Sequence, residues 1–170
     1  VFCGDGRNNV ANSLMVASAK LGVNFSLAAP KSLWPDENLV NICKDIALST
    51  GSIIEFNEDI YSAVKDADVI YTDVWVSMGE ADSVWEERIN LLKKYQVNSD
   101  VLSHAKESAI FLHCLPSFHD LNTTIGKDIY EKFGLREMEV TDEVFRMDKS
   151  KVFDEAENSC LLYTSPSPRD

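Results

Sequence analysis

Three segments of the sequence gather residues whose side chains can bind or transform a small molecule. They span residues 4–9, 72–79 and 113–116, and each directly follows or closes a short apolar run. Short apolar runs bounded by turn residues predict buried strands. Ligands of open parallel sheets bind beyond the carboxyl ends of the strands, where the strand order reverses. If the order is 3-2-1-4-5, the first, fourth and fifth strands are neighbours, and all three segments line one cleft.

The first segment partly matches a dinucleotide-binding loop. Gly4 and Gly6 follow a strand and precede a helix, but the third glycine of that fingerprint would fall at Asn9. The acid expected after the second strand is also missing from residues 23–30. Both departures disfavour NAD. Asn8 and Asn9 are left at a helix N-terminus, where they can cap the helix or bind an anionic group such as a carboxylate.

The second segment places Asp73 at a strand end, with Ser77, Met78 and Gly79 after it. A carboxylate at this position can bind an ammonium group, and Gly79 would let the loop move. The alternative interpretation is a loop acid that simply faces water.

The third segment pairs His113 with Cys114. A cysteine and a histidine can act as nucleophile and base, but consecutive strand residues point to opposite faces, so His113 is poorly placed to serve Cys114. A metal cluster that adds His119 and Asp120 is disfavoured, because this spacing fits no familiar zinc pattern. The Leu115–Pro116 step predicts a tight turn, or even a cis peptide, that aims backbone groups into the cleft.

Alternating strands and helices position these segments. We expect strands at residues 1–3, 23–29, 53–56, 69–74 and 109–114, with a brief extended piece at 138–140. We expect helices at residues 9–21, 36–50, 59–67, 82–95, 99–105 and 127–133. Repeated strand–helix units predict parallel pairing. The predicted fold is therefore α/β, a doubly wound parallel sheet of four to five strands in three α/β/α layers, with strand order 3-2-1-4-5.

The composition narrows the class of protein. The chain has 170 residues, of which 45% are hydrophobic, so one domain with a substantial core is expected. Its 28 acidic residues outnumber 16 Lys and Arg, and the net charge of −12 disfavours nucleic acid and anionic membranes as partners. No apolar run approaches the roughly 20 residues that span a bilayer. A reduced, cytoplasmic chain is expected, because no C-x-x-C pair occurs among Cys3, Cys43, Cys114 and Cys160.

Taken together, these segments resemble ornithine carbamoyltransferase. The resemblance rests on GDGRNNVANSL from Gly4, YTDVWVSMGE from Tyr71, YQVNSD from Tyr95, FLHCLPSFHD from Phe111, EVTDEVF from Glu139 and VFDEAEN from Val152. The Ser-Met-Gly loop together with His-Cys-Leu-Pro separates this family from aspartate carbamoyltransferase. The likeness extends over residues 1–158, which are similar to the second, ornithine-binding domain.

The resemblance implies an enzyme of arginine metabolism that transfers the carbamoyl group of carbamoyl phosphate to the δ-amine of L-ornithine, giving L-citrulline and phosphate, without a metal or organic cofactor. It implies that Asn9 holds the ornithine carboxylate. It also implies that Asp73, helped by Ser77, accepts the α-ammonium group, and that the Met78 backbone contacts the carboxylate. Cys114 would sit near the attacking nitrogen. The Leu115 backbone would contact the carbamoyl group.

The chain departs from the family pattern at both ends. By this resemblance the chain is expected to lack the family's first domain, with its Ser-Thr-Arg-Thr motif, and Ser159 stands where the family has an arginine that contacts carbamoyl phosphate. Residues 159–170 are expected to be an unstructured, foreign tail, and the chain alone is expected to be inactive. The intact enzyme would be a homotrimer or larger. The alternatives are a putrescine carbamoyltransferase, a stand-alone amino-acid-binding or interaction module, and a non-catalytic nucleotide-binding domain.

Overall fold

The computed structural model describes residues 1–76 and 83–164, with the backbone alone for 159–164. A single five-stranded sheet forms its centre, in the order β3-β2-β1-β4-β5, with every strand pair parallel. The predicted α/β class and the strand order 3-2-1-4-5 are both confirmed. The strands are β1 (Phe2–Cys3), β2 (Phe25–Ala28), β3 (Ile54–Asn57), β4 (Val69–Thr72) and β5 (Ile110–His113).

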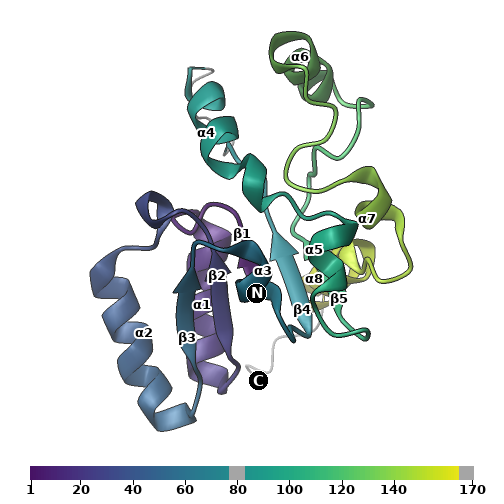
Figure 1. Ribbon diagram of the computed structural model, residues 1–170. Coiled ribbons are helices and arrows are strands. Elements are labelled where there is room, and N and C mark those ends of the chain that lie inside the picture. Colours follow the sequence, from purple (N-terminus) through teal and green to yellow (C-terminus); the bar gives the residue numbers. More distant parts are fainter. Residues whose placement is uncertain (77–82, 165–170) are drawn as a thin grey trace.

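Helices cover both faces of the sheet and complete the predicted three layers (Figure 1). Met15 and Cys43 pack α1 and α2 against one face of the sheet, and Val64 and Leu102 pack α3 and α5 against the other. The helices are α1 (Asn9–Leu21), α2 (Glu37–Thr50), α3 (Ile60–Val64), α4 (Val84–Leu92), α5 (Ser99–Ser103), α6 (Thr124–Phe133), α7 (Asp142–Arg146) and α8 (Val152–Thr164), with 3-10 turns η1 (Lys31–Leu33) and η2 (Lys93–Tyr95). Within residues 1–76 and 83–164, none of the helices has the length and apolar character needed to cross a bilayer.

Capping residues set where the predicted helices begin and end. Gly22 and Gly51 close α1 and α2 in the left-handed conformation, which glycine adopts without a steric penalty. Asp59 caps α3, as its position predicts, by accepting a hydrogen bond from the Ser62 N–H. These local signals explain why the first half of the fold follows the expected pattern closely.

The second half of the chain differs from the expected pattern. The predicted helix 82–95 is instead α4 followed by the turn η2, and its first residue lies outside the described residues. The short helix α7 was not predicted, because five residues are too few to show a helical period. The expected unstructured tail is wrong for residues 159–164, where the backbone continues α8.

The register of the central strands aligns their carboxyl ends. Thr72 of β4 is the register partner of Cys3 in β1 and of His113 in β5. A buried hydrogen bond of 2.7 Å from Thr72 Oγ1 to the Cys3 carbonyl oxygen fixes one of these pairings. The residues that follow the three partners are Gly4, Asp73 and Cys114, so they leave the sheet side by side. Helices α4 and α6 lie beyond this end of the sheet (Figure 1).

Candidate functional site

Asp73 is the centre at which the three strand ends meet. Its side chain is buried, and its Oδ2 accepts a hydrogen bond of 2.8 Å from Asn8 Nδ2, from the loop after β1. Its Oδ1 accepts from the Val74 N–H at 2.8 Å and from Cys114 Sγ, after β5, at 3.1 Å. The predicted convergence of the three segments is therefore confirmed for Asp73 and Cys114.

Asn8 and Asn9 take different positions, although they are neighbours in the sequence. Asn8 is buried and caps α1, because its Oδ1 accepts from the Ala11 N–H while its amide nitrogen reaches Asp73. Asn9 is the first residue of α1 and is exposed. The sequence pattern named both asparagines as helix caps or anion-binding residues, but the contact of Asn8 with Asp73 was not predicted. The available signal was its position as the residue immediately before the expected helix.

The thiol of Cys114 is a hydrogen-bond donor to Asp73. Partial burial of the sulfur, together with this hydrogen bond and the negative charge of Asp73, raises the pKa of Cys114 to about 12. The thiolate is the nucleophilic form of cysteine. At neutral pH the side chain is therefore a neutral thiol, which suits a polar neighbour of a reacting group and not a covalent nucleophile.

His113 faces away from Cys114, as the alternation of strand side chains predicts. Its Nδ1 accepts a hydrogen bond of 2.9 Å from the Leu115 N–H, and its Nε2 lies 3.1 Å from Glu139 Oε1. An Nδ1 that accepts from a backbone N–H leaves the ring proton on Nε2, directed at the carboxylate. Both ring nitrogens therefore form hydrogen bonds that support the backbone after β5, and neither is available as a base for the Cys114 thiol.

Glu139 is the buried anchor of this arrangement. Its side chain is fully buried, and Oε1 accepts hydrogen bonds from His113 Nε2, from Ser117 Oγ and from the Phe118 N–H. Burial alone would raise the pKa of Glu139, but the hydrogen bonds that its carboxylate accepts from His113 and from the Phe118 N–H outweigh burial and lower the pKa. Sequence reasoning missed Glu139, and the available signal was a single acid between the apolar residues Met138 and Val140.

Leu115 has a backbone conformation that residues other than glycine rarely adopt. Its φ angle is 55°, and the peptide bond to Pro116 is cis. A non-glycine residue in the left-handed region costs about 1–2 kcal/mol, so the surroundings must hold it there. The hydrogen bond from the Leu115 N–H to His113, which Glu139 orients in turn, supplies that support.

The metal-ligating residues considered from the sequence fall into two separate groups. Asp73, His113 and Cys114 place donor atoms within 4.8 Å of one another, and so do His119, Asp120 and Asp142. In the first group Nδ1 of His113 already accepts a backbone N–H and the thiol already bonds Asp73. In the second, Arg146 already bridges the two carboxylates. A metal ion would have to displace these partners.

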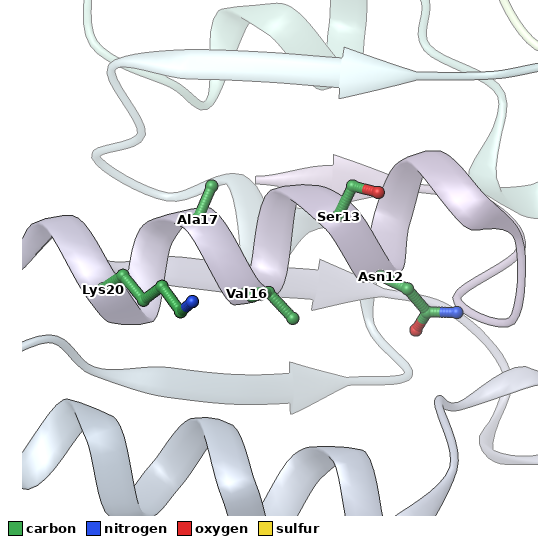
Figure 2. A pocket seen from close by; sticks show the side chains of 5 residues that line it. All are labelled: Asn12, Ser13, Val16, Ala17 and Lys20. Carbon is green, nitrogen blue, oxygen red and sulfur yellow. The ribbon is translucent and has the colours of Figure 1, made fainter.

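Two further predicted contacts and one surface hollow complete the description. Ser77 and Met78 lie outside the described residues. A hollow of about 460 Å³ lies along one face of α1, where Figure 2 shows the side chains that line it. None of these is a predicted site residue: they are Asn12, Ser13, Val16, Ala17 and Lys20. The convergence at Asp73, and not this hollow, defines the candidate site.

Comparison with known proteins places this geometry in a family. Residues 1–164 match the model of the Asp/Orn-binding domain of aspartate/ornithine carbamoyltransferases. The chain belongs to the aspartate/ornithine carbamoyltransferase family. Within this family it is 64% identical over 154 residues to the catabolic ornithine carbamoyltransferase of Mycoplasma capricolum subsp. capripneumoniae, covering 91% of the chain and 49% of that relative.

Other carbamoyltransferases give the same picture. The chain is 60% identical over 157 residues to the catabolic enzyme of Treponema denticola, covering 92% of the chain and 46% of that relative. The solved ornithine carbamoyltransferase from Pyrococcus furiosus superposes with a TM-score of 0.75 at 41% identity, covering 92% of this chain and 44% of that one. The chain thus spans about half the length of the relatives it matches.

The raised pKa of Cys114 predicts slow alkylation. At pH 7.5 we expect iodoacetamide to modify Cys114 at least tenfold more slowly than free cysteine, because almost no thiolate is present. Asp73→Asn removes the negative charge of Asp73, which contributes to raising this pKa. The variant should therefore react faster, by roughly threefold for each unit of pKa lost, since a less basic thiolate is also less nucleophilic.

Peptide mapping by mass spectrometry measures this rate separately from those of the other cysteines. Asp45→Asn, on the exposed surface of α2, is the matched control and should leave the rate unchanged. Alkylation of native Cys114 at the rate of free cysteine would contradict the assignment of a neutral thiol.

Removing the Glu139 carboxylate should destabilise the fold. We expect Glu139→Ala to lower the free energy of unfolding by roughly 3–5 kcal/mol at pH 7, because three donors lose a shared buried acceptor. Urea unfolding measures the change, and Glu107→Ala on the exposed surface should stay within about 0.5 kcal/mol. If Glu139→Ala lowered the free energy of unfolding by less than about 1 kcal/mol, the carboxylate would not be a major stabilising group.

The same carboxylate gives a defined pH dependence. The pKa of Glu139 in the folded chain lies below its ordinary value of 4.5, so its stabilising contribution is complete above pH 4.5 and is lost as the pH falls through the folded pKa. The stability difference between the native chain and Glu139→Gln should consequently shrink on acidification below pH 4.5.

Proposed function

We propose that the protein is the ornithine-binding half of an ornithine carbamoyltransferase. The observation that carries this proposal is the Asp73 carboxylate, held where three parallel strand ends meet in a chain of this family. The named relatives support ornithine as the acceptor. The whole reaction transfers the carbamoyl group of carbamoyl phosphate to the δ-amine of L-ornithine, which gives L-citrulline and phosphate.

The acceptor is held at both of its α-substituents in this proposal. Asp73 accepts the α-ammonium group, and Ser77 assists it. The α-carboxylate lies at the N-terminus of α1, near Asn9 and the Met78 backbone, because the positive end of a helix dipole favours an anion. A net charge of −12 also favours a cationic acceptor over an acidic one such as aspartate. Putrescine is disfavoured because it has no carboxylate for Asn9 to hold.

Catalysis in this proposal depends on positioning. The neutral δ-amine attacks the carbonyl carbon, a C–N bond forms, and the C–O bond to phosphate breaks. The nitrogen loses one proton, which the departing phosphate takes up. Cys114 stays a neutral thiol beside the amine, and the Leu115 backbone contacts the carbamoyl group. Holding two reactants in one geometry can supply about 7–11 kcal/mol of the barrier, which makes a covalent intermediate unnecessary.

Partners beyond ornithine belong to the whole enzyme. Because the chain spans about half the length of its relatives, the carbamoyl phosphate site and the assembly into a homotrimer or larger form are proposed for that enzyme. We expect the 170-residue chain to bind ornithine without forming citrulline by itself.

Binding of L-ornithine to the purified chain tests the proposal. Isothermal titration calorimetry should detect L-ornithine binding, with L-aspartate and putrescine bound at least tenfold more weakly. Asp73→Asn should weaken ornithine binding by at least about tenfold, because a hydrogen bond between two charged groups is worth about 1.5–3 kcal/mol.

Asp45→Asn is the matched control, since it removes the same charge from an exposed position on α2. It should leave the affinity unchanged. Equal affinity for ornithine in the native chain and in Asp73→Asn would exclude Asp73 as the ammonium site.

A further inference from the structure

A partly buried ion pair joins α4 to the loop after β1. Arg88 Nη1 lies 2.5 Å from Asp5 Oδ2, and the two side chains are only 17% and 7% exposed. The residues are 83 positions apart in the sequence. Removing one partner of such a pair leaves an uncompensated charge in a poorly hydrated position. The pair therefore constrains both elements strongly.

Asp5 is also hydrogen-bonded to the backbone of the turn that carries Asn8. Its Oδ1 accepts from the Arg7 N–H at 2.9 Å, and its carbonyl oxygen accepts from the Asn8 N–H at 3.3 Å. The turn is also closely packed at Gly6, because a Cβ added there would lie 2.7 Å from the carbonyl oxygen of Leu33. A shift of Asp5 must consequently move the backbone that carries Asn8.

Asn8 connects the turn to the proposed ammonium-binding carboxylate. Its amide nitrogen donates to Asp73 Oδ2, and its Oδ1 accepts from the Ala11 N–H. A continuous series of contacts thus runs from Arg88 through Asp5 and Asn8 to Asp73. Supporting contacts of this kind determine how accurately a binding group is held.

We infer that Arg88, acting through Asp5 and Asn8, is a positioning residue that orients the Asp73 carboxylate and so sets the preference for acceptors that carry an α-ammonium group. This inference rests on the proposed function, because Asp73 is assigned to the α-ammonium group there. In this inference Arg88 is a positioning residue and not a catalytic one, because it acts through Asp5.

Arg88→Met tests the inference, because methionine keeps much of the apolar stem and removes the charge. Calorimetry compares L-ornithine with 5-aminovalerate, which is ornithine without its α-amino group. We expect ornithine to bind at least tenfold more weakly to the variant and 5-aminovalerate to change less than twofold. Arg88→Lys should restore most of the ornithine affinity. Arg146→Met, at an exposed arginine, is the control and should change neither affinity.

Hydrogen exchange provides a second readout that needs no ligand. The N–H groups of Ala11 and Val74 bond Asn8 Oδ1 and Asp73 Oδ1, so both should exchange at least tenfold faster in Arg88→Met. The Thr141 N–H, which bonds the Val97 carbonyl oxygen away from this series, should keep its protection. Asp5→Asn should reproduce the result if Arg88→Met does not fold.

The outcomes separate the inference from the proposed function. Unchanged protection of Ala11 and Val74, equal loss of protection at Thr141, or equal weakening of both ligands would overturn the positioning role. If the native chain binds no ornithine, the proposed function fails. The exchange rates then still decide whether Arg88 positions Asp73, and a negative result there overturns the inference separately.

Discussion

The parallel register of β1, β4 and β5 is the constraint on which the site depends. Because Thr72 pairs with both Cys3 and His113, the next residue of each strand emerges at the same level. This alignment is what brings Cys114 within hydrogen-bond distance of Asp73. A slip of one residue would send every side chain of the slipped strand to the other face, and would remove that contact. The buried bond from Thr72 to the Cys3 carbonyl oxygen opposes such a slip.

A second layer of support lies behind the strand ends. Alternation along β5 directs His113 into the core while Cys114 follows toward Asp73. The buried Glu139 carboxylate accepts hydrogen bonds from one backbone N–H and from two side chains, one of which is His113. His113 in turn accepts a hydrogen bond from the Leu115 N–H. The backbone can therefore keep a positive φ at Leu115 beside the thiol. One buried charge thus shapes a turn that touches the proposed reaction site.

Much of this architecture could be predicted from the sequence. Alternating apolar runs and capped helices indicate the parallel sheet, and the strand order brings the polar segments together at Asp73 and Cys114. Contacts between distant residues could not be predicted, because no local pattern links Glu139 to His113 or Arg88 to Asp5. Asn8 and Asn9 show a further limit of prediction from the sequence.

Asn8 turns inward and Asn9 outward because α1 begins one residue later than Asn8. The expected helix begins at this same residue, Asn9, so the boundary was predicted, but the contact between Asn8 and Asp73, 65 positions apart, was not. The resemblance to ornithine carbamoyltransferase assigned Asn9 to the ligand, whereas the hydrogen bonds show that Asn8 holds Asp73.

The central claim is that the three strand ends form one acceptor site around Asp73. A crystal structure of the chain with L-ornithine tests it most directly. The account predicts the α-ammonium nitrogen within about 2.7–3.2 Å of an Asp73 carboxylate oxygen, with the side chain of the ligand directed toward Cys114. Ornithine bound elsewhere, for example in the hollow along α1, with Asp73 still bonded only to Asn8, Val74 and Cys114, would contradict it.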